Sequence, residues 1–272
     1  MTAHAEQPAS WPMADKALRA VGAQWLVVAF AGQALFAAYV AASYGDATIG
    51  GDFEKWNDIL VGGYVRGGLI GNIMFAAHLR LAVTITLGGP LQLIPALHNR
   101  FRSFHGWNGR FDLLTALIMS AGGIYMVWTR GTAGGDAMRV GISPNGVLIV
   151  ACAMLTWRAA LARRFDSHRR WALRTFILVR GVWLFRIGFM FWVLANQGPV
   201  GVGEDFDGPF VRFWAYGCYL VALVVLELNF RAQDAQSKSS KHAMTAGLAM
   251  LVVARDAGIA GAAMIMWAPR LV

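Results

Sequence analysis

The chain has 272 residues, of which 57% are hydrophobic and only 14% are charged, and its formal net charge is +9. Soluble domains carry about 25% charged residues, so this composition excludes an ordinary soluble domain. The positive charge does not indicate nucleic-acid binding, because the basic residues gather in short segments between long apolar stretches.

Seven apolar stretches are long enough to cross a bilayer, whose hydrocarbon core of about 30 Å needs about 20 mostly apolar residues per helix. The sequence therefore predicts an all-α fold, a polytopic transmembrane helix bundle of about seven spans, in a single domain (residues 17–268). We expect a flexible N-terminal tail (1–16), which lacks the features of a cleaved signal peptide, and a short C-terminal tail (269–272). The predicted spans are residues 17–44, 67–93, 111–129, 141–161, 171–197, 209–230 and 243–268.

The segments between these spans alternate between basic and non-basic. Lys and Arg resist translocation, so basic loops stay in the cytoplasm. The pattern predicts a cytoplasmic N-terminus, seven spans and an outer C-terminus, in a bacterial inner membrane. A six-span alternative, with the last helix lying on the membrane surface, stays open because Arg255 and Asp256 fall within that helix. The basic loops hold Arg100, Arg102 and Arg110, then Arg163, Arg164, Arg169 and Arg170, and finally Arg231, Lys238 and Lys241.

Ionisable side chains inside the predicted spans are candidates for a functional site. Each costs about 2.5–3.5 kcal/mol to insert into hydrocarbon, so it normally faces protein, water or a ligand. Two interpretations stay open for Arg180: an ion pair with Asp256 while the other arginines reach toward the interface, or an anion bound among the arginines. Glu227 is expected to pair with Arg231, one turn later on the same helix. The candidates are His78, Arg80, Arg180, Arg186, Arg255 and Asp256.

Two histidines share one sequence setting, because each precedes a predicted helix and is followed by a tryptophan and arginines. They are His105, in His-Gly-Trp-Asn-Gly-Arg, and His168, in His-Arg-Arg-Trp. The setting predicts that both imidazoles lie at one level on the cytoplasmic side. Two imidazoles on separate helices can ligate a haem iron or form part of a zinc site. The alternative is that both are polar residues at helix starts, anchored by the tryptophans.

Three motifs, in this order, resemble the bacterial membrane protein family DUF2306. They are His-x-x-Leu at 78–81 with Leu-Gly-Gly-Pro-Leu-Gln-Leu-Ile-Pro at 87–95, His-Gly-Trp-x-Gly-Arg at 105–110, and Asp-x-His-Arg-Arg-Trp-x-x-Arg at 166–174. Gly106 departs from the family, which often has a basic residue there. The resemblance implies a multi-span helical protein and directs attention to His78, His105 and His168. At the level of the fold, it is loosely similar to the b-type cytochrome membrane bundles.

One hypothesis from these residues is a membrane redox protein. Haem b would be ligated by two of the three histidines His78, His105 and His168. Equal depth favours His105 with His168, and His78 would then face a quinone or a second haem. Arginines would hold the haem propionates, since the planar guanidinium suits carboxylates. Those arginines are Arg80, Arg180 and Arg186.

The alternative is a non-enzymatic protein, either a transporter or an accessory subunit that packs against a larger membrane complex. Small residues on the last predicted helix favour close contact between helices. A zinc hydrolase is a weaker third hypothesis, because Asp112 and Asp166 are the only carboxylates near the two histidines. The small residues are Ala257, Gly258, Gly261 and Ala262.

Overall fold

The computed structural model describes residues 12–58, 60 and 62–270, and within these it contains helices and no strands. The predicted all-α, polytopic bundle is therefore confirmed. The elements are α1 (Pro12–Ile49), η1 (Phe53–Asp58), α2 (Leu69–Leu91), α3 (Pro95–Arg100), α4 (Arg102–Arg130), α5 (Gly135–Leu161), α6 (Phe165–Val179), α7 (Gly181–Ala195), α8 (Pro209–Asp234), α9 (Lys238–Gly261), η2 (Ala262–Trp267) and η3 (Ala268–Arg270).

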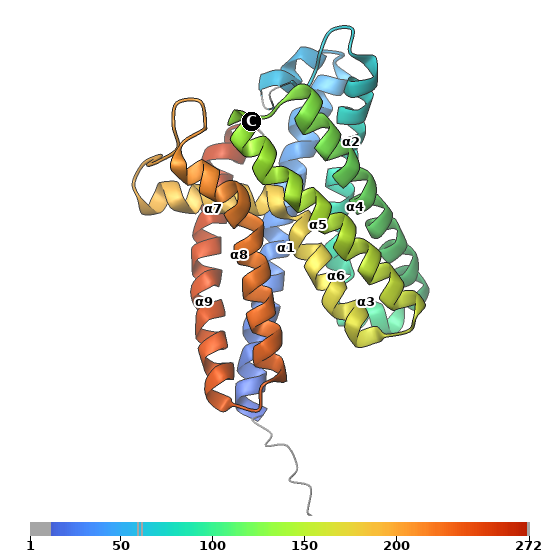
Figure 1. Ribbon diagram of the computed structural model, residues 1–272, viewed down its shortest axis with the longest axis vertical. Coiled ribbons are helices and arrows are strands. Elements are labelled where there is room, and N and C mark those ends of the chain that lie inside the picture. The colour runs from blue at the N-terminus through green and yellow to red at the C-terminus, as the bar shows by residue number, and fades with distance from the viewer. Residues whose placement is uncertain (1–11, 59, 61, 271–272) are drawn as a thin grey trace, which may run out of the picture.

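The bundle is shaped like a V, with two arms that spread apart toward the lower end of Figure 1. α8, α9 and the lower part of α1 form one arm, and α2, α4, α5 and α6 form the other. α1 packs against both α2 and α9, while α5 packs against α8, so these contacts join the arms. The start of α1, α3, the α5–α6 turn and the α8–α9 turn all lie at the lower end. We call this the basic side, because it carries the basic segments of the sequence.

The predicted fifth span, residues 171–197, is not one helix. It consists of most of α6 and of α7, which meet at Arg180 at an angle of 58°. Each of these helices has 15 residues, or about 22 Å at 1.5 Å per residue, which is too short to cross alone. In the described part of the chain, six helices can span a membrane, or seven if this bent pair counts as one. The last helix is among the six, as Lys238–Arg270, so the doubt about the number of spans concerns α6–α7.

Several helices begin on the basic side before the apolar stretches do. α4 starts at Arg102 rather than at residue 111, and α6 starts at Phe165 rather than at residue 171. α1 likewise starts at Pro12, within the segment expected to be a tail, and residues 1–11 lie outside the described part. Hydropathy marks only the part of a helix that hydrocarbon covers, whereas arginines continue the helix into the interface. As a result, His105 and His168 lie within helices and are each the fourth residue of their helix.

At the opposite end, one arginine ties the α1–α2 connection to α4. Arg130, the last residue of α4, donates to the carbonyls of Gly62, Gly63 and Gly68 at 3.0, 2.9 and 3.2 Å. It also donates to Oδ1 of Asn72 at 2.7 Å. A loop without helix or strand bonds leaves its carbonyls unpaired, and one guanidinium satisfies those of Gly62 and Gly63 here. The carbonyl of Gly68 also accepts from the backbone N–H of Asn72 at 2.9 Å.

The small residues of the last helix are used inside the chain. A methyl group at Gly258 would overlap the carbonyl of Ile187 on α7, and one at Gly261 would come within 2.8 Å of Leu194. The close helix contact expected from these residues is therefore the packing of α9 on α7. They do not form a free surface for another subunit.

Candidate functional site

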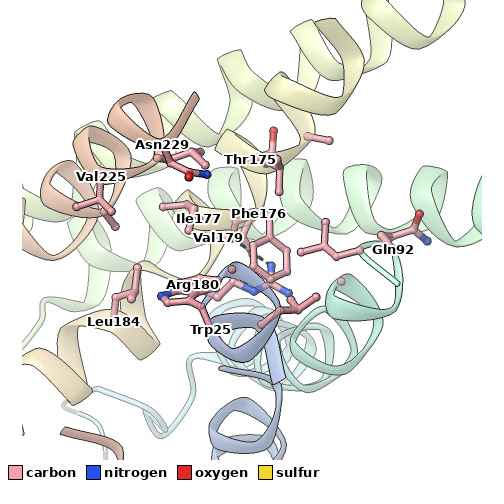
Figure 2. Close-up of a pocket in the computed structure, with 18 of the residues that line it drawn as sticks. Trp25, Gln92, Thr175, Phe176, Ile177, Val179, Arg180, Leu184, Val225 and Asn229 are labelled. Carbon is pink, nitrogen blue, oxygen red and sulfur yellow. Dashed lines mark hydrogen bonds between the residues drawn. The ribbon is translucent and has the colours of Figure 1, made fainter. Parts of the chain in front are cut away.

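A cleft of about 2200 Å³ lies between the two arms, and eight of the helices contribute to its wall. Typical small-molecule pockets measure about 300–1,000 Å³, so the cleft has room for a long or broad ligand. Most of the wall is apolar, as Leu184 and Val225 in Figure 2 illustrate. The polar side chains that matter below are Gln92, His105, Asp112, His168 and Arg180, all of which line the cleft.

Arg180 lies at the break between α6 and α7 and is only 6% exposed. It donates from Nε to Oε1 of Gln33 on α1 at 3.1 Å, and from its Nη atoms to the carbonyls of Phe176 and Ile85 at 3.2 and 3.3 Å. Its Cζ lies 3.5 Å from the ring centroid of Phe176 (Figure 2). Arginine has five N–H donors, so two are not used by these three bonds.

The charge of Arg180 has no ion-pair partner among the described residues. The interpretation that paired it with Asp256 is wrong, because Asp256 binds the neighbouring Arg255 at 3.0 Å. Arg255 in turn donates to the carbonyl of Trp25 at 2.6 Å. The guanidinium of Arg180 faces α1 and α2, whereas α9 packs on α1 and α7. The alternative of a bound anion therefore stays a prediction.

The glycine pair of the first sequence motif makes room for two ionisable groups. A methyl group at Gly89 would overlap Nη2 of Arg180, and one at Gly88 would lie 3.1 Å from Oδ1 of Asp112. Consecutive Cα atoms are about 3.8 Å apart. The guanidinium of Arg180 and the carboxylate of Asp112 therefore approach α2 at adjacent residues. Glycine at both positions avoids the steric crowding that a larger side chain would cause.

Asp112 is half-buried on α4 and has few hydrogen bonds. Its Oδ2 accepts one weak bond from Nδ2 of Asn108 at 3.4 Å, and its Oδ1 has no partner among the described residues. Asn108 also donates to the carbonyl of Gly88 at 3.2 Å. Asp112 is the carboxylate whose charge acts on Arg180, although the two do not form an ion pair.

His105 lies on the same face of α4 as Asn108 and Asp112, at the basic end of the cleft. With its amide oxygen toward Gly109, Gln92 donates to Nδ1 of His105 at 2.8 Å. A neutral His105 in that arrangement carries its own proton on Nε2.

His168 has the opposite arrangement. Its Nδ1 lies 3.1 Å from the carbonyl of Thr156, which can only accept, so Nδ1 is the donor. A neutral His168 therefore keeps a lone pair on Nε2, the form in which a histidine ligates a metal. Thr156 is itself fixed by bonds to the carbonyl of Cys152 at 2.7 Å and to Thr175 at 3.2 Å.

The remaining predicted site residues lie elsewhere and do not line the cleft. His78 packs against Gly123 of α4, and its Nδ1 has no partner in the described part of the chain. Arg186 lies over the ring of Phe36 at 5.3 Å and donates to its own helix. Arg80 is exposed on α2. The structure thus brings His105, His168 and Arg180 to one cleft and leaves these three outside it.

The expected pair of Glu227 and Arg231 is also wrong. Glu227 accepts two bonds from Arg174 on α6, from Nε at 2.6 Å and from Nη2 at 3.0 Å. Arg174 also lies 4.4 Å from the ring centroid of Trp171. A fork bonded to both carboxylate oxygens and stacked on a ring is stronger than a pair within one helix.

The sequence interpretation missed the residues that surround Arg180. Gln33 is 1% exposed, and its Nε2 has no partner among the described residues. His105, Asn108 and Asp112 are spaced three and four apart, which places them on one helical face. That spacing was visible in the sequence, but only if α4 was extended back to Arg102.

The described residues contain no group of three or more His, Cys, Asp or Glu side chains that could hold a metal ion. Zinc sites use three or four protein ligands. Among the described residues, the zinc hypothesis therefore has only His105 and His168 as ligands.

Comparison with known proteins agrees with the motifs. A family model described as "Predicted membrane protein (DUF2306)" matches residues 75–230, which is more than half of the chain. No curated protein and no solved structure matches. The matched segment contains the glycine pair, Asp112, His105, His168 and Arg180, and it leaves out Gln33. The chain is a multi-pass membrane protein and belongs to the DUF2306 family.

Proposed function

We propose that the protein binds a membrane-soluble amphipathic ligand in the cleft, with acceptor oxygens of its head group on Arg180. The observation that carries this proposal is the buried guanidinium of Arg180, which lines an apolar cleft. Among the described residues it has no ion pair, and its three hydrogen bonds leave two N–H groups unused. A charge inside a bilayer needs a partner. A ligand oxygen supplies one, and the apolar wall receives the rest of the molecule.

The helix break strengthens the attraction for such a head group. α7 begins at Gly181, directly after Arg180. The first N–H groups of a helix lack partners within it and carry partial positive charge. Irregular backbone inside a membrane is tolerated where it is buried in protein or lines a cavity. Broken helices around a cavity are also how many transporters hold a substrate, so binding in a transport cycle is one use of this site.

Within this proposal, a quinone-linked redox role is the finer function that the polar groups suit best. A quinone has two carbonyl oxygens and a long apolar tail, which match donors at one place and an apolar cleft beyond it. Arg180, which has N–H groups beyond its three bonds, is such a donor, and the polar side chain of His105 lines the same cleft from another helix. The redox role itself follows from the ligand and stays a proposal.

Haem b is the second cofactor to consider, because two histidines line the same cleft. His168 is ready to ligate iron through Nε2. His105 is not ready to ligate iron while Gln92 donates to its Nδ1, because a neutral His105 then carries its proton on Nε2. Ligation by both would require His105 to give up the Gln92 bond. A visible spectrum of the purified protein decides this point: a Soret band lost in both His105→Ala and His168→Ala would favour haem over quinone.

The ligand proposal is tested by extracting the purified protein. The full chain is purified in mild detergent, and bound molecules are extracted and identified by mass spectrometry. We expect an amphipathic molecule that is enriched with the wild type and with Arg158→Gln, an exposed arginine outside the cleft. It should be lost from folded Arg180→Gln. Equal extracts from all three proteins would overturn the proposal.

A specific observation favours a second function, that of a subunit in a larger membrane complex. Arg80 is exposed halfway along α2, eleven residues from either end, or about 16 Å from each. That is about half the thickness of the hydrocarbon core, so reaching water is difficult. A carboxylate on another membrane protein would compensate the charge. Blue native electrophoresis tests this: a larger complex that Arg80→Gln dissolves would support the subunit role, and a single small species in both would contradict it.

A further inference from the structure

We infer that binding of an anionic head group at Arg180 is linked to the uptake of one proton by Asp112. This inference rests on the proposed function and adds a regulatory property to the same site. It predicts that the ligand binds more tightly as the pH falls.

The geometry places both groups at the same part of the cleft. Arg180 and Asp112 both line it, and their heads approach the adjacent glycines 89 and 88 of α2. They act on each other electrostatically without forming an ion pair. Both residues line the cleft, where Arg180 keeps two N–H groups beyond its three bonds, while Oδ1 of Asp112 is buried against Gly88 and has no partner among the described residues.

The carboxylate of Asp112 is weakly stabilised by its surroundings. Its one hydrogen bond, from Asn108, is 3.4 Å long. Without a ligand, the guanidinium of Arg180 approaches the adjacent glycine of α2 but forms no ion pair with this carboxylate. An anionic head group on Arg180 would offset that positive charge and bring a second negative charge close to Asp112. Two like charges at one site disfavour ionisation of both, so Asp112 binds a proton and can then donate a hydrogen bond to the ligand.

Other titratable groups in the cleft need to be separated from Asp112. Arg180, from the α6–α7 break, is the charged group that acts on it. α2 presents Gly88 to it, and its nearest neighbour on α4 is the uncharged Asn108. His105 and His168 line the same cleft nearer the basic end. Asp15 on α1 and Asp166 on α6 are further carboxylates of the wall, together with Arg19, Arg102, Arg110, Arg169 and Arg255.

Proton uptake can be counted by calorimetry on the full chain in detergent. The probe is dodecanesulfonate, whose head group stays charged across the whole range, so the ligand itself does not titrate. Titrations in two buffers with different ionisation enthalpies, from about pH 5 to about pH 8, give the number of protons bound with the ligand. The same titration into Arg180→Gln measures partition of the probe into micelles.

We expect uptake that approaches one proton per ligand and an affinity that falls up to tenfold for each unit of rising pH. Asp112→Asn should bind the probe with no proton uptake and a flat pH profile. Asp166→Asn, a carboxylate of the same wall, should keep both. In His105→Gln and His168→Gln, the proton uptake per bound probe should persist whatever the affinity.

The outcomes distinguish the two proposals. If wild type and Arg180→Gln give the same heats, the sulfonate does not bind at Arg180 and the proposed function fails for anionic ligands. If the probe binds to the wild type with no proton uptake at any pH, the linkage is wrong while the site stands. Uptake that disappears in a histidine variant instead of Asp112→Asn would also overturn the inference. The number of protons that the wild type takes up with the probe tests the linkage even if Asp112→Asn does not fold.

Discussion

Replacing Gly89 by alanine tests whether the structure holds the guanidinium of Arg180 in place. The added methyl group would overlap Nη2 of Arg180. The guanidinium is bonded on three sides, so it relieves the overlap by giving up the carbonyl of Ile85. Crowding a packed interior costs about 1–3 kcal/mol, and losing a bond from a charged donor costs about 1.5–3 kcal/mol. Alanine returns about 1 kcal/mol in helix propensity, so we expect a net loss of about 1.5–5 kcal/mol.

Thermal unfolding in detergent measures this loss. For a chain of this size, 1 kcal/mol shifts Tm by about 2–4 °C, so Gly89→Ala should unfold at least ~3 °C below the wild type. Gly247→Ala is the matched control, because its methyl group meets nothing within 4 Å. Gly88→Ala, at 3.1 Å from Asp112, should fall between the two. If Gly89→Ala unfolds at the temperature of Gly247→Ala, the guanidinium is free to move and the reasoning from its fixed position is refuted.

Three further predictions concern the rest of the fold. Arg130→Gln removes four hydrogen bonds, and we expect the free energy of unfolding to fall by about 3 kcal/mol. Hydrogen exchange in residues 62–68 should become faster, and unchanged exchange would contradict the role of Arg130 in holding the α1–α2 connection. A double-mutant cycle with Arg174→Gln and Glu227→Gln should give a coupling of about 1–3 kcal/mol, whereas additive losses would show that the pair contributes nothing. Arg164→Cys, on the basic side, should react with an impermeant maleimide only after the cells are permeabilised, and labelling of intact cells would reverse the predicted orientation.

Much of the fold follows from the sequence because a bilayer imposes a simple demand. A spanning helix needs a long apolar stretch, so existence and order of the long helices could be predicted. The break at Arg180 could not, because α6 and α7 together have the length and composition of one span. The pair Arg180–Gly181 inside that stretch was the available signal. Gly181 leaves room for Asn145, whose Nδ2 would approach any methyl group there.

The site was only partly predictable, because the sequence interpretation placed the start of α4 too late. Asp112 was the second residue of a predicted span and looked like an interfacial carboxylate. α4 in fact begins at Arg102, so Asp112 lies about 15 Å along the helix and reaches the cleft. Pairings between helices, such as Glu227 with Arg174, depend on how each helix is rotated about its axis. Hydropathy fixes length but says little about rotation, so the pair of Arg180 with Asp256, which was inferred from depth, and that of Glu227 with Arg231, which was inferred from spacing on one helix, were both wrong.

The break between α6 and α7 leaves backbone carbonyls that side chains must satisfy. Where α6 ends, the carbonyls of its last turn lose their helical partners. Two side chains supply new ones: Arg180 donates to the carbonyl of Phe176, and Asn145 donates to the carbonyl of Leu178 at 3.2 Å. A neutral donor would satisfy a carbonyl as well as an arginine does, without the cost of an inserted charge. Capping the helix therefore explains why a donor stands at the break but not why it is charged, and the unexplained charge is what points to a ligand.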